Sequence, residues 1–505
     1  MEFDKKLVSK ILDPIHGIIR LTDLELSFID HPLFQRLRTI KQNTFLYKVF
    51  PSAMHTRFEH SLGVMNLSYE ILKHLQINSF RFTKKNSDTS YVFQSVEHLP
   101  LANIQELRLA ALMHDIGHGP MSHQFDSFLP DNRSFKSSLG DQFPELFEMV
   151  GEEGIEHEHI SLIFVKVIYD SLTEKEQLEI NIDNVMMIIE SKYLHRSIPI
   201  EIETQKIDIL PMLTSIISSC PIDADRMDYL QRDGYFSGVK CGIYDFNRLF
   251  MSIVPVVETG KLYLAYTESC IDSIAEFISA RSNLFSQVYY HKTNRAFSVM
   301  LDSICKAAKK DNSNDIFNNY NEEHKSNYIE NITSFYLTNS DSYFLDTQLP
   351  KLIANCKKPI PAKEILEDLK NRKPWIKKYE SKIYPKDLNI TNKINKSSIN
   401  LLKSEIVEIL SSKVNDIYFS VDVMTDNAFK DIDKTEIKLL TKNYMSEYKL
   451  NRFDQCGDKL NKHQSIKCFI RVFIDPRFQS KIDSKTLQRI ENCKIDFLKS
   501  HSLIS

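Results

Sequence analysis

The sequence predicts a mainly α-helical protein with a helical core and a smaller α+β lobe at its C-terminus. Residues 1–300 alternate apolar positions at helical spacing with short polar loops, and only Lys261–Tyr266 and its neighbourhood look like a strand. Helical spacing returns over 350–380, whereas 401–505 mix helices with β-branched runs at 417–423 and 468–474. We therefore expect a catalytic core over 1–300, a helical extension and linker over 301–400, and the lobe over 401–505.

The composition is typical of an intracellular enzyme. A chain of 505 residues that is 42% hydrophobic can form a large core in two lobes. No apolar run reaches the roughly 18 residues that cross a bilayer, and the charged start is unlike a signal peptide. The eight cysteines show no paired spacing, as expected of reduced thiols. We expect a cytoplasmic protein without membrane contact. The net charge of −3 argues against a general nucleic-acid binder, although a local basic groove would not appear in that sum.

Residue types that bind metals are concentrated in the ten positions from 114 to 123. The apolar run 109–113 predicts a buried helix that delivers His114 and Asp115, and the four-residue step to His118 keeps both imidazoles on one helix face. Glycines and a proline then end the helix, so His123 can return to the same place. A single histidine of this kind is more often a surface residue at a helix end than a metal ligand. The four residues together suit a first-row divalent ion, on which water ionises near neutral pH. The sequence therefore predicts a metal-dependent hydrolase.

Other polar runs adjoin apolar helical segments and supply further candidate ligands. One begins the helix that follows residue 59, one covers residues 223–233, and one precedes the apolar run 160–164. Their candidate residues are His60, then Asp225, Tyr229 and Asp233 on one helical face, and the pair His157 and His159 around Glu158.

A ligand set of two histidines and two aspartates drawn from three helices resembles that of the HD phosphohydrolase superfamily. Within it, the chain is similar to the HD-domain dNTP triphosphohydrolases, whose animal members add a sterile-alpha-motif domain, and to their bacterial relatives. The resemblance is strong over 10–300 and thin beyond. It begins close to the first residue, so we expect no sterile-alpha-motif domain before it. The matching segments are Asp13–Gly17, Phe34–Gln42, Val49–Gly63 and Arg281–Lys292, with weaker echoes at 365–373, 417–423 and 470–474.

The resemblance implies a divalent metal cofactor. The ion would polarise a phosphate group and bind the attacking water. Its identity stays open between Mg, Mn, Fe and Zn. The implied ligands are His60, His114, Asp115 and Asp225.

The resemblance also implies acid–base residues beside the metal. His118 and His157 match histidines around the α-phosphate, and His159 is a one-residue alternative to His157. His123 is the candidate general acid that protonates the departing 5′-oxygen. Asp126, three residues further on, would orient that ring and raise its pKa.

An anionic triphosphate requires cations beyond the metal, and guanidinium groups bind phosphate oxygens in a bidentate manner. Arg57 lies three residues before His60 and is well placed for this role. For Arg57 and for the further cations named next, the alternative role is an ion pair at the protein surface. By resemblance, the other phosphate contacts are Arg226, Arg281 and Lys292, the sugar contacts are Gln42, Tyr229 and Asp233, and Tyr289 closes on the 2′ edge of the sugar.

A regulatory site is implied by the resemblance as well. In the animal enzymes, residues matching Asp30, Gln35 and Arg38 line a site where an activating guanine nucleotide binds between subunits. Here Leu12 replaces an asparagine of that site, and 43–45 stand where relatives often have a flexible glycine-containing segment. The 35–38 stretch can equally cap and pack a helix. Activation by a nucleotide therefore stays open, and we expect a homo-oligomer, either a dimer or a tetramer.

Three functions remain after these observations. The leading one is a dNTP triphosphohydrolase that releases a deoxynucleoside and tripolyphosphate, in microbial nucleotide homeostasis or antiphage defence. The alternatives are an HD-type nuclease or phosphodiesterase acting on nucleic acid and a non-catalytic nucleotide sensor. Tyr229, Asp233 and Tyr289 favour a mononucleotide, since a phosphodiesterase requires an open groove with stacking aromatics. The intact ligand set argues against a sensor.

Overall fold

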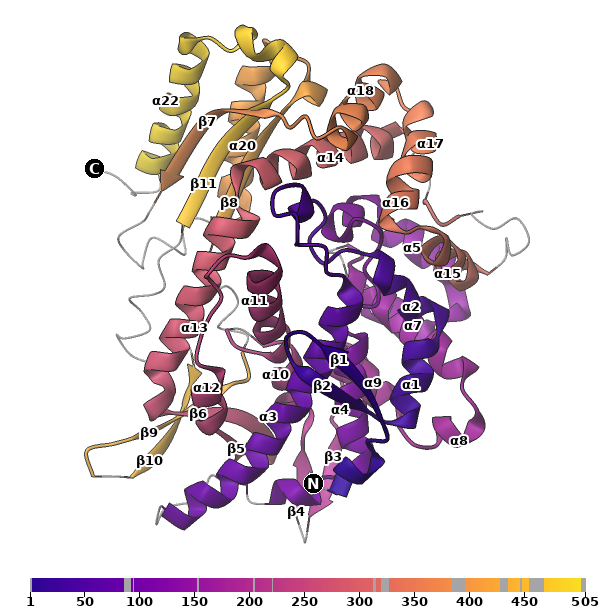
Figure 1. The fold of residues 1–505 in the computed structure, drawn as a ribbon, viewed down its shortest axis with the longest axis vertical. Helices are drawn as coiled ribbons and strands as arrows, with labels where there is room; N and C mark the ends of the chain where they lie inside the picture. Colours follow the sequence, from indigo (N-terminus) through magenta and orange to yellow (C-terminus); the bar gives the residue numbers. More distant parts are fainter. Residues whose placement is uncertain are drawn as a thin grey trace.

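Helices dominate the computed structural model, which confirms the predicted fold class (Figure 1). Among the described residues, no helix combines the length and apolar character needed to cross a membrane. The structure describes residues 2–85, 92–93, 95–151, 154–202, 205–219, 221–311, 315–318, 327–383, 396–426, 435–445, 447–453 and 467–500.

Four helices form the part of the core that carries the candidate site. They are α3 (Arg57–Lys85), α4 (Leu101–Met113), α7 (His157–Ser171) and α11 (Ala224–Ser237), and α3 packs between α4 and α11. Every residue of α4 from 103 to 113 is buried, as expected of a helix in the centre of a large core. Because α4 is enclosed on all sides, its C-terminal end is held in a defined position.

The remaining helices surround this centre, link it to the C-terminal lobe, or, for α20 and α22, belong to that lobe. In Figure 1, α14 lies beneath that lobe, and α14 contacts both α18 and β8. The helices are α1 (Asp23–Asp30), α2 (Pro32–Gln35), α5 (Asn132–Leu139), α6 (Pro144–Met149), α8 (Glu174–Gln177), α9 (Ile182–Ile189), α10 (Leu210–Ile217), α12 (Phe246–Met251), α13 (Ile271–Leu284), α14 (Lys292–Asp311), α15 (Tyr328–Thr338), α16 (Asp341–Tyr343), α17 (Leu349–Ala354), α18 (Pro359–Lys370), α20 (Lys396–Ser411) and α22 (Ser484–Ser500).

The described strands form three sheets. One is the hairpin β1–β2, the second has the order β10-β9-β6-β4-β3 with β5 also paired to β6, and the third has the order β7-β11-β8. Their bounds are β1 (Ser9–Asp13), β2 (Gly17–Leu21), β3 (Pro199–Ile202), β4 (Gln205–Asp208), β5 (Ile253–Glu258), β6 (Lys261–Thr267), β7 (Ile376–Ile383), β8 (Phe419–Asp426), β9 (Lys438–Lys442), β10 (Tyr448–Arg452) and β11 (Lys467–Ile474).

The strand predictions were partly right. Strand β6 confirms the strand-like run at 261–266, and β8 and β11 confirm the two β-branched runs of the C-terminal part. The expectation of a single strand region within 1–300 was wrong, because β1 to β4 precede it. These four strands have only four or five residues each, which is too short for a period of two to stand out from the surrounding pattern.

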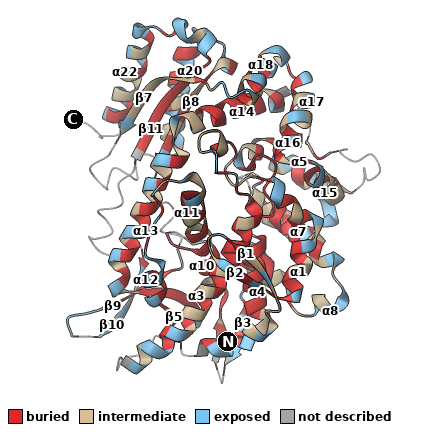
Figure 2. Cartoon of the chain, viewed as in Figure 1, coloured by how far each residue is buried: buried red, intermediate tan, exposed pale blue. Residues whose placement is uncertain are grey.

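Two of the three hydrophobic clusters among the described residues correspond to the core and the lobe, and Figure 2 shows buried residues gathered inside both. The lobe core is formed by α20, α22 and the sheet β7-β11-β8. Strand β7 comes from the predicted extension, whereas β9 and β10 of the predicted lobe join the sheet of the core. The linker expected within 381–400 lies largely outside the described residues. We keep the three-part division as a proposal.

Candidate active site

Four side chains from three helices of the core converge on one point. His60 lies on the first turn of α3, His114 and Asp115 directly follow α4, and Asp225 lies on the first turn of α11. The Nε2 atom of His60 lies 3.1 Å from Asp225 Oδ1 and 3.5 Å from Asp115 Oδ2. The Nε2 atom of His114 lies 3.5 Å from Asp115 Oδ1 and 3.9 Å from Asp225 Oδ1. These are the four residues that the sequence predicted as metal ligands.

The electrostatics of this cluster suit a divalent cation. The Nε2 atoms of His60 and His114 are buried and have no hydrogen-bond partner among the described residues. Burial alone would lower the pKa of His60, but the carboxylates of Asp225 and Asp228 outweigh it and raise that pKa to about 10. Imidazole nitrogens without partners, enclosed by carboxylates that stabilise a positive charge, fit a first-row divalent metal.

Asp115 is held ionised inside this cluster. Burial alone would raise the pKa of its carboxyl, but Arg57 and His114 outweigh burial and hold that pKa well below its usual value. The Nη1 atom of Arg57 forms an ion pair with Asp115 Oδ2, and its Nε atom donates to Ser122 Oγ over 3.0 Å. An ionised Asp115 can therefore serve both the metal position and the guanidinium next to it.

The turn after α4 is held by side chains from distant parts of the chain. Met121 and Ser122 adopt φ values of 65° and 51°, in the left-handed region that non-glycine residues rarely occupy. Asp341 accepts hydrogen bonds from the backbone nitrogen of Met121 over 2.7 Å and from that of Lys41 over 2.9 Å. Asp341 was not predicted as a site residue, although it fixes the backbone immediately before His123.

Arg36 supports the same turn from inside the protein. Its guanidinium donates to the carbonyl oxygen of His118 over 2.9 Å and to that of Ile116. It also lies over the ring of Tyr336, 4.8 Å from the centroid. Burial lowers the pKa of Arg36 to about 10, so it stays charged at neutral pH. The turn that carries His118 is thereby anchored to the core.

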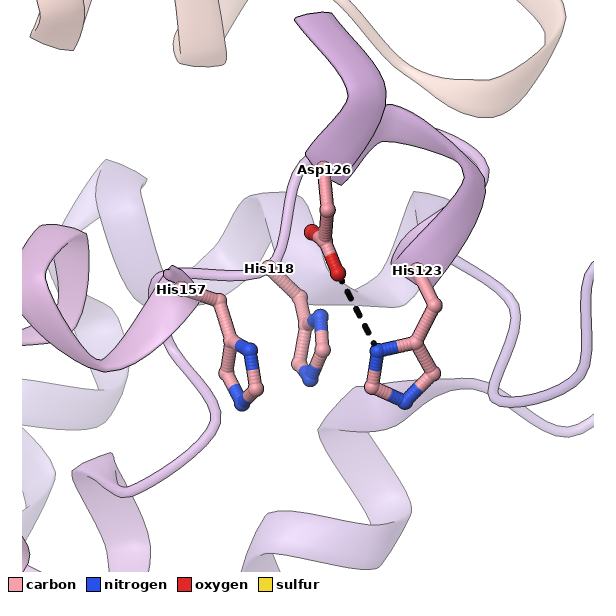
Figure 3. Close-up of side chains that lie close together, drawn as sticks. All are labelled: His118, His123, Asp126 and His157. Carbon is pink, nitrogen blue, oxygen red and sulfur yellow. Dashed lines mark hydrogen bonds and ion pairs between the residues drawn. The ribbon is translucent and has the colours of Figure 1, made fainter. Parts of the chain in front are cut away.

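Figure 3 shows a second group of side chains. It adjoins the four candidate metal ligands, because His118 Nε2 lies 3.4 Å from Asp115 Oδ1. His118 and His157 stack with their ring centroids 3.7 Å apart, and His123 lies with its ring centroid 4.8 Å from that of His118. The Nδ1 atom of His123 lies 3.3 Å from Asp126 Oδ2, and its side chain is 67% exposed. The structure therefore brings together all four predicted acid–base residues. By contrast, His159 Nδ1 accepts a hydrogen bond from the Glu156 backbone at the start of α7.

The two stacked histidines are neutral at physiological pH. Burial lowers the pKa of His157 to about 4 and holds that of His118 well below its usual value, to which Arg57 contributes. Burial also raises the pKa of the neighbouring Glu158 to about 7. Neutral imidazoles can donate or accept hydrogen bonds without adding charge next to the metal position.

A cavity of about 510 Å³ adjoins both groups, within the roughly 300–1,000 Å³ usual for small-molecule sites. Ten of the predicted site residues line it. These are Gln42, Arg57, Asp115, His118, His123, His157, Asp225, Tyr229, Asp233 and Tyr289, and the lining also includes Asn43, Phe45, Glu158, Phe285, Tyr290, Asn294 and Arg295.

Asp233 lies in the wall of this cavity with three donors around its carboxylate. Its Oδ2 atom accepts from Asn43 Nδ2 over 2.9 Å and from the Tyr289 hydroxyl, and its Oδ1 atom lies 2.5 Å from His55 Nε2. Burial alone would raise the pKa of Asp233, but hydrogen bonds from these neighbours lower it. Asn43 and His55 were not predicted as site residues. Asn43 directly follows the matching segment Phe34–Gln42 and His55 lies inside Val49–Gly63, but their contacts arise only from the folded arrangement.

The neighbouring tyrosines face different partners. Tyr289 reaches Asp233, whereas the Tyr290 hydroxyl donates to the Thr425 carbonyl over 3.2 Å. Residues 285–289 form a π-helical turn, so the spacing from Arg281 to Lys292 does not follow a regular α-helical period.

Three predicted phosphate contacts are not among the residues that line the cavity. Arg226 forms an ion pair with Asp223, the residue that caps α11. The guanidinium of Arg281 lies over the ring of Phe285, 4.3 Å from the centroid. Lys292 is the exposed first residue of α14. Their role toward phosphate stays a proposal.

The residues predicted for nucleotide regulation lie on the surface formed by α1, α2 and the 3₁₀ turn Arg36–Thr39. Arg38 Nε donates to Gln35 Oε1 over 2.9 Å, and Gln35 Nε2 donates to the Ile29 carbonyl over 2.8 Å. Arg38 and Asp30 are exposed, and none of the three predicted residues lines the cavity. Their contacts are equally those of a capped and packed turn, so regulation stays a proposal.

Comparison with known proteins places an HD domain on this site. Residues 57–233 match the HD domain family model, a range that begins at the start of α3 and ends at Asp233. This part of the chain, which carries all four candidate metal ligands, is therefore similar to an HD domain.

The relatives include characterised and uncharacterised proteins. The chain is 31% identical over 298 residues to the deoxynucleoside triphosphate triphosphohydrolase SAMHD1 of Danio rerio, covering 57% of this chain and 43% of that protein. It is 31% identical over 291 residues to the uncharacterized protein MJ1154 of Methanocaldococcus jannaschii, covering 58% and 48%. It is also 31% identical over 299 residues to the uncharacterized protein YwfO of Bacillus subtilis, covering 59% and 55%. The chain therefore spans about half the length of these relatives.

Proposed function

We propose that this protein is a metal-dependent triphosphohydrolase that converts a dNTP and water into a deoxynucleoside and tripolyphosphate. The main support for the proposal is the position of the cavity. It extends from the candidate metal ligands and the neighbouring histidines to Asp233 and Tyr289. A cavity of about 510 Å³ suits a mononucleotide better than a polymer. The similarity to proteins named as dNTP triphosphohydrolases supports this substrate class.

The phosphate end of the substrate faces the HD ligands. A divalent ion held by His60, His114, Asp115 and Asp225 would supply Lewis acidity toward a phosphate oxygen and lower the pKa of a bound water. Arg57 lines the cavity and binds a phosphate oxygen through its remaining guanidinium nitrogen, Nη2, because Asp115 pairs with Nη1 and Ser122 accepts from Nε.

His123 donates the proton in this scheme. Cleavage of the bond between the α-phosphorus and the 5′-oxygen leaves an alkoxide that requires a proton, and His123 supplies it at the 5′-oxygen. Asp126 orients the ring from 3.3 Å away, and the neutral His118 and His157 hydrogen-bond to the α-phosphate.

The sugar occupies the other end of the cavity. Asp233 and Tyr229 bind the 3′-hydroxyl, Gln42 contributes a further polar contact, and Tyr289 packs against the 2′ edge. The Oε1 atom of Gln42 is buried without a hydrogen-bond partner among the described residues, so it is available to a hydroxyl donor. Depletion of dNTPs by this reaction would serve microbial nucleotide homeostasis or antiphage defence in the cytoplasm.

The experiment that tests the function is hydrolysis of defined substrates. Purified protein with Mg²⁺ or Mn²⁺ is incubated with each of four dNTPs and four NTPs, singly and in mixtures, and with single-stranded DNA. We expect deoxynucleoside and tripolyphosphate from dNTPs. Cleavage of DNA alone would contradict the proposal and favour the phosphodiesterase alternative, and metal binding without any hydrolysis would favour the sensor.

Tyr289→Ala should narrow the preference for deoxy over ribo substrates. A buried hydroxyl without a partner costs on the order of 1–3 kcal/mol, which corresponds to roughly 5–150-fold discrimination at C2′. Removing the ring admits the 2′-hydroxyl, so the ratio of kcat/KM for dGTP and GTP, or for the active pair, should fall. The matched control is Tyr290→Ala, because the hydroxyl of Tyr290 contacts Thr425 instead of Asp233. Loss of the preference in the control alone would assign the role to Tyr290.

Light scattering should give at least a dimer, and a tetramer in the presence of dNTPs. The exposed apolar side chains of the β1–β2 hairpin support this expectation. Leu12 is 80% exposed and Ile18 59%, and the two residues are paired across the hairpin. A second copy of the chain that covers this face would bury both. A monomer with full activity under all nucleotide conditions would contradict both the oligomer and the proposed activator site.

A further inference from the structure

A buried charged cluster lies directly behind the metal ligands and has no part in the proposed reaction. Its centre is Asp228 on α11, which is 0% exposed. One carboxylate oxygen, Oδ2, lies 2.7 Å from His60 Nδ1 and accepts from Arg232 Nε over 2.9 Å. The other, Oδ1, lies 2.6 Å from His16 Nε2 and accepts from Arg232 Nη2 over 2.9 Å. Asp228 therefore joins a metal ligand to two other elements.

The other end of the cluster lies in the β1–β2 turn. Arg232 Nη1 donates to Asp13 Oδ2 over 2.8 Å. The Oδ1 atom of Asp13 accepts from the backbone nitrogens of Ile15 and His16, both over 2.9 Å, and so closes the turn. Asp13, Arg232 and Asp228 are all buried. The motif Asp13–Gly17, which has no role in the chemistry, is thereby connected to His60.

Gly63 leaves the room that this arrangement requires. It follows His60 by three residues on α3, and a Cβ atom at Gly63 would lie 1.9 Å from Asp228 Oδ1 and 2.6 Å from Arg232 Nη2. Such distances are far inside van der Waals contact. Any other residue at 63 would displace the carboxylate from His60.

The geometry decides which nitrogen of His60 faces the metal position. A carboxylate only accepts hydrogen bonds, so His60 must carry a proton on Nδ1 to bond with Asp228. Its Nε2 atom then faces Asp115 and Asp225, where it would lose its proton and offer a lone pair to a bound cation. A carboxylate behind a ligating imidazole fixes its orientation and increases its basicity.

We propose that Asp228 is a positioning residue for the metal centre. The β1–β2 turn controls the orientation of the Asp228 carboxylate in two ways: His16 contacts it directly, and Asp13 holds Arg232, which also contacts it. This inference rests on the metal ligands of the proposed function. The N-terminal hairpin then affects metal affinity indirectly, through Asp228 and His60.

Titration of metal-free full-length protein with Co²⁺, followed by the visible absorption of the bound ion, tests this inference. Asp228→Asn keeps the shape of the side chain but presents an amide to donors on both sides, so Co²⁺ affinity should fall by roughly 10–100-fold. His16→Ala removes one of the groups that hold Asp228 and should lower the affinity by a smaller factor.

Glu25→Gln is the matched control. Glu25 is also 0% exposed and paired with a buried arginine, Arg108, over 2.6 Å, but it has no contact with the metal ligands. Thermal unfolding should show both Asp228→Asn and Glu25→Gln destabilised, whereas only Asp228→Asn should bind Co²⁺ more weakly. Unchanged Co²⁺ affinity in Asp228→Asn would overturn the inference. If that variant does not fold, the affinity of His16→Ala decides the question in the same way.

The two proposals can fail separately. Co²⁺ binding is measured without substrate, so wild-type protein that binds Co²⁺ and hydrolyses no dNTP would overturn the proposed function and leave the positioning role intact. If the wild-type protein is active and Asp228→Asn binds Co²⁺ as tightly as the wild type, only the positioning role is overturned.

Discussion

Asp115→Asn should reduce dNTP hydrolysis to background and lower the bound metal, while the protein stays folded. Asp115 lies between the imidazoles of His60 and His114 and forms an ion pair with Arg57. An amide is a poor ligand beside two imidazoles and carries no charge to hold the guanidinium. Both the metal position and the phosphate contact would therefore be lost with a change of one atom.

Three measurements check this prediction: release of tripolyphosphate, metal content by elemental analysis, and thermal unfolding by circular dichroism. Asp475→Asn is a suitable control, because Asp475 is 1% exposed and paired with Arg477 in the C-terminal part of the chain. This control should keep its metal and its turnover. Wild-type turnover in Asp115→Asn would remove the metal-site interpretation.

His123→Ala should lose roughly 10²–10⁴-fold in turnover and retain both metal and substrate, as expected when a general acid is removed. The side chain is 67% exposed, so its truncation should change the unfolding temperature little. Asp126→Asn should cause a smaller loss, because it changes the orientation of the acid and not the proton donor itself. Steady-state kinetics with metal analysis separates the two variants.

A different result for His123→Ala would change the roles assigned to His123 and its neighbours. The ligand atoms of His118, His123, Asp126 and His157 all lie within 4.8 Å of one another, a spacing that a metal ion also accepts. Loss of bound metal in His123→Ala would identify His123 as a ligand and contradict its role as the acid. Retention of metal with full turnover would remove both roles.

The fold could be predicted where the signal is local. Long apolar periods and the uniformly apolar end of α4 predicted the helical core, and the β-branched runs predicted β8 and β11. The hairpin β1–β2 could not be predicted in the same way. Its strands have five residues each, and their pairing depends on partners that a periodic pattern does not contain.

The supporting residues of the candidate site could not be predicted for a similar reason. Asp341 contacts the backbone of residues 41 and 121, and Asp228 contacts His16 across 212 positions. Asp228 had a partial signal, three residues after Asp225 on a polar helix. For Asp341, a single aspartate in a short helix, the sequence offered none.

The sequence by itself determined which residue types stand at each helix end and which of them share a face, because the helical period of 3.6 residues is a local property of the backbone. The sequence therefore placed Tyr229 in register with Asp225 on α11, whereas the shared helix face expected for His114 and His118 was wrong, because α4 ends at Met113. The tertiary structure decided which of these faces meet. Packing of α3 between α4 and α11 brings His60 to Asp225 and turns Arg57 into the cavity, whereas Arg226 pairs with Asp223 outside its lining. Contacts between distant segments depend on how whole helices bury their apolar faces, and no local pattern specifies that.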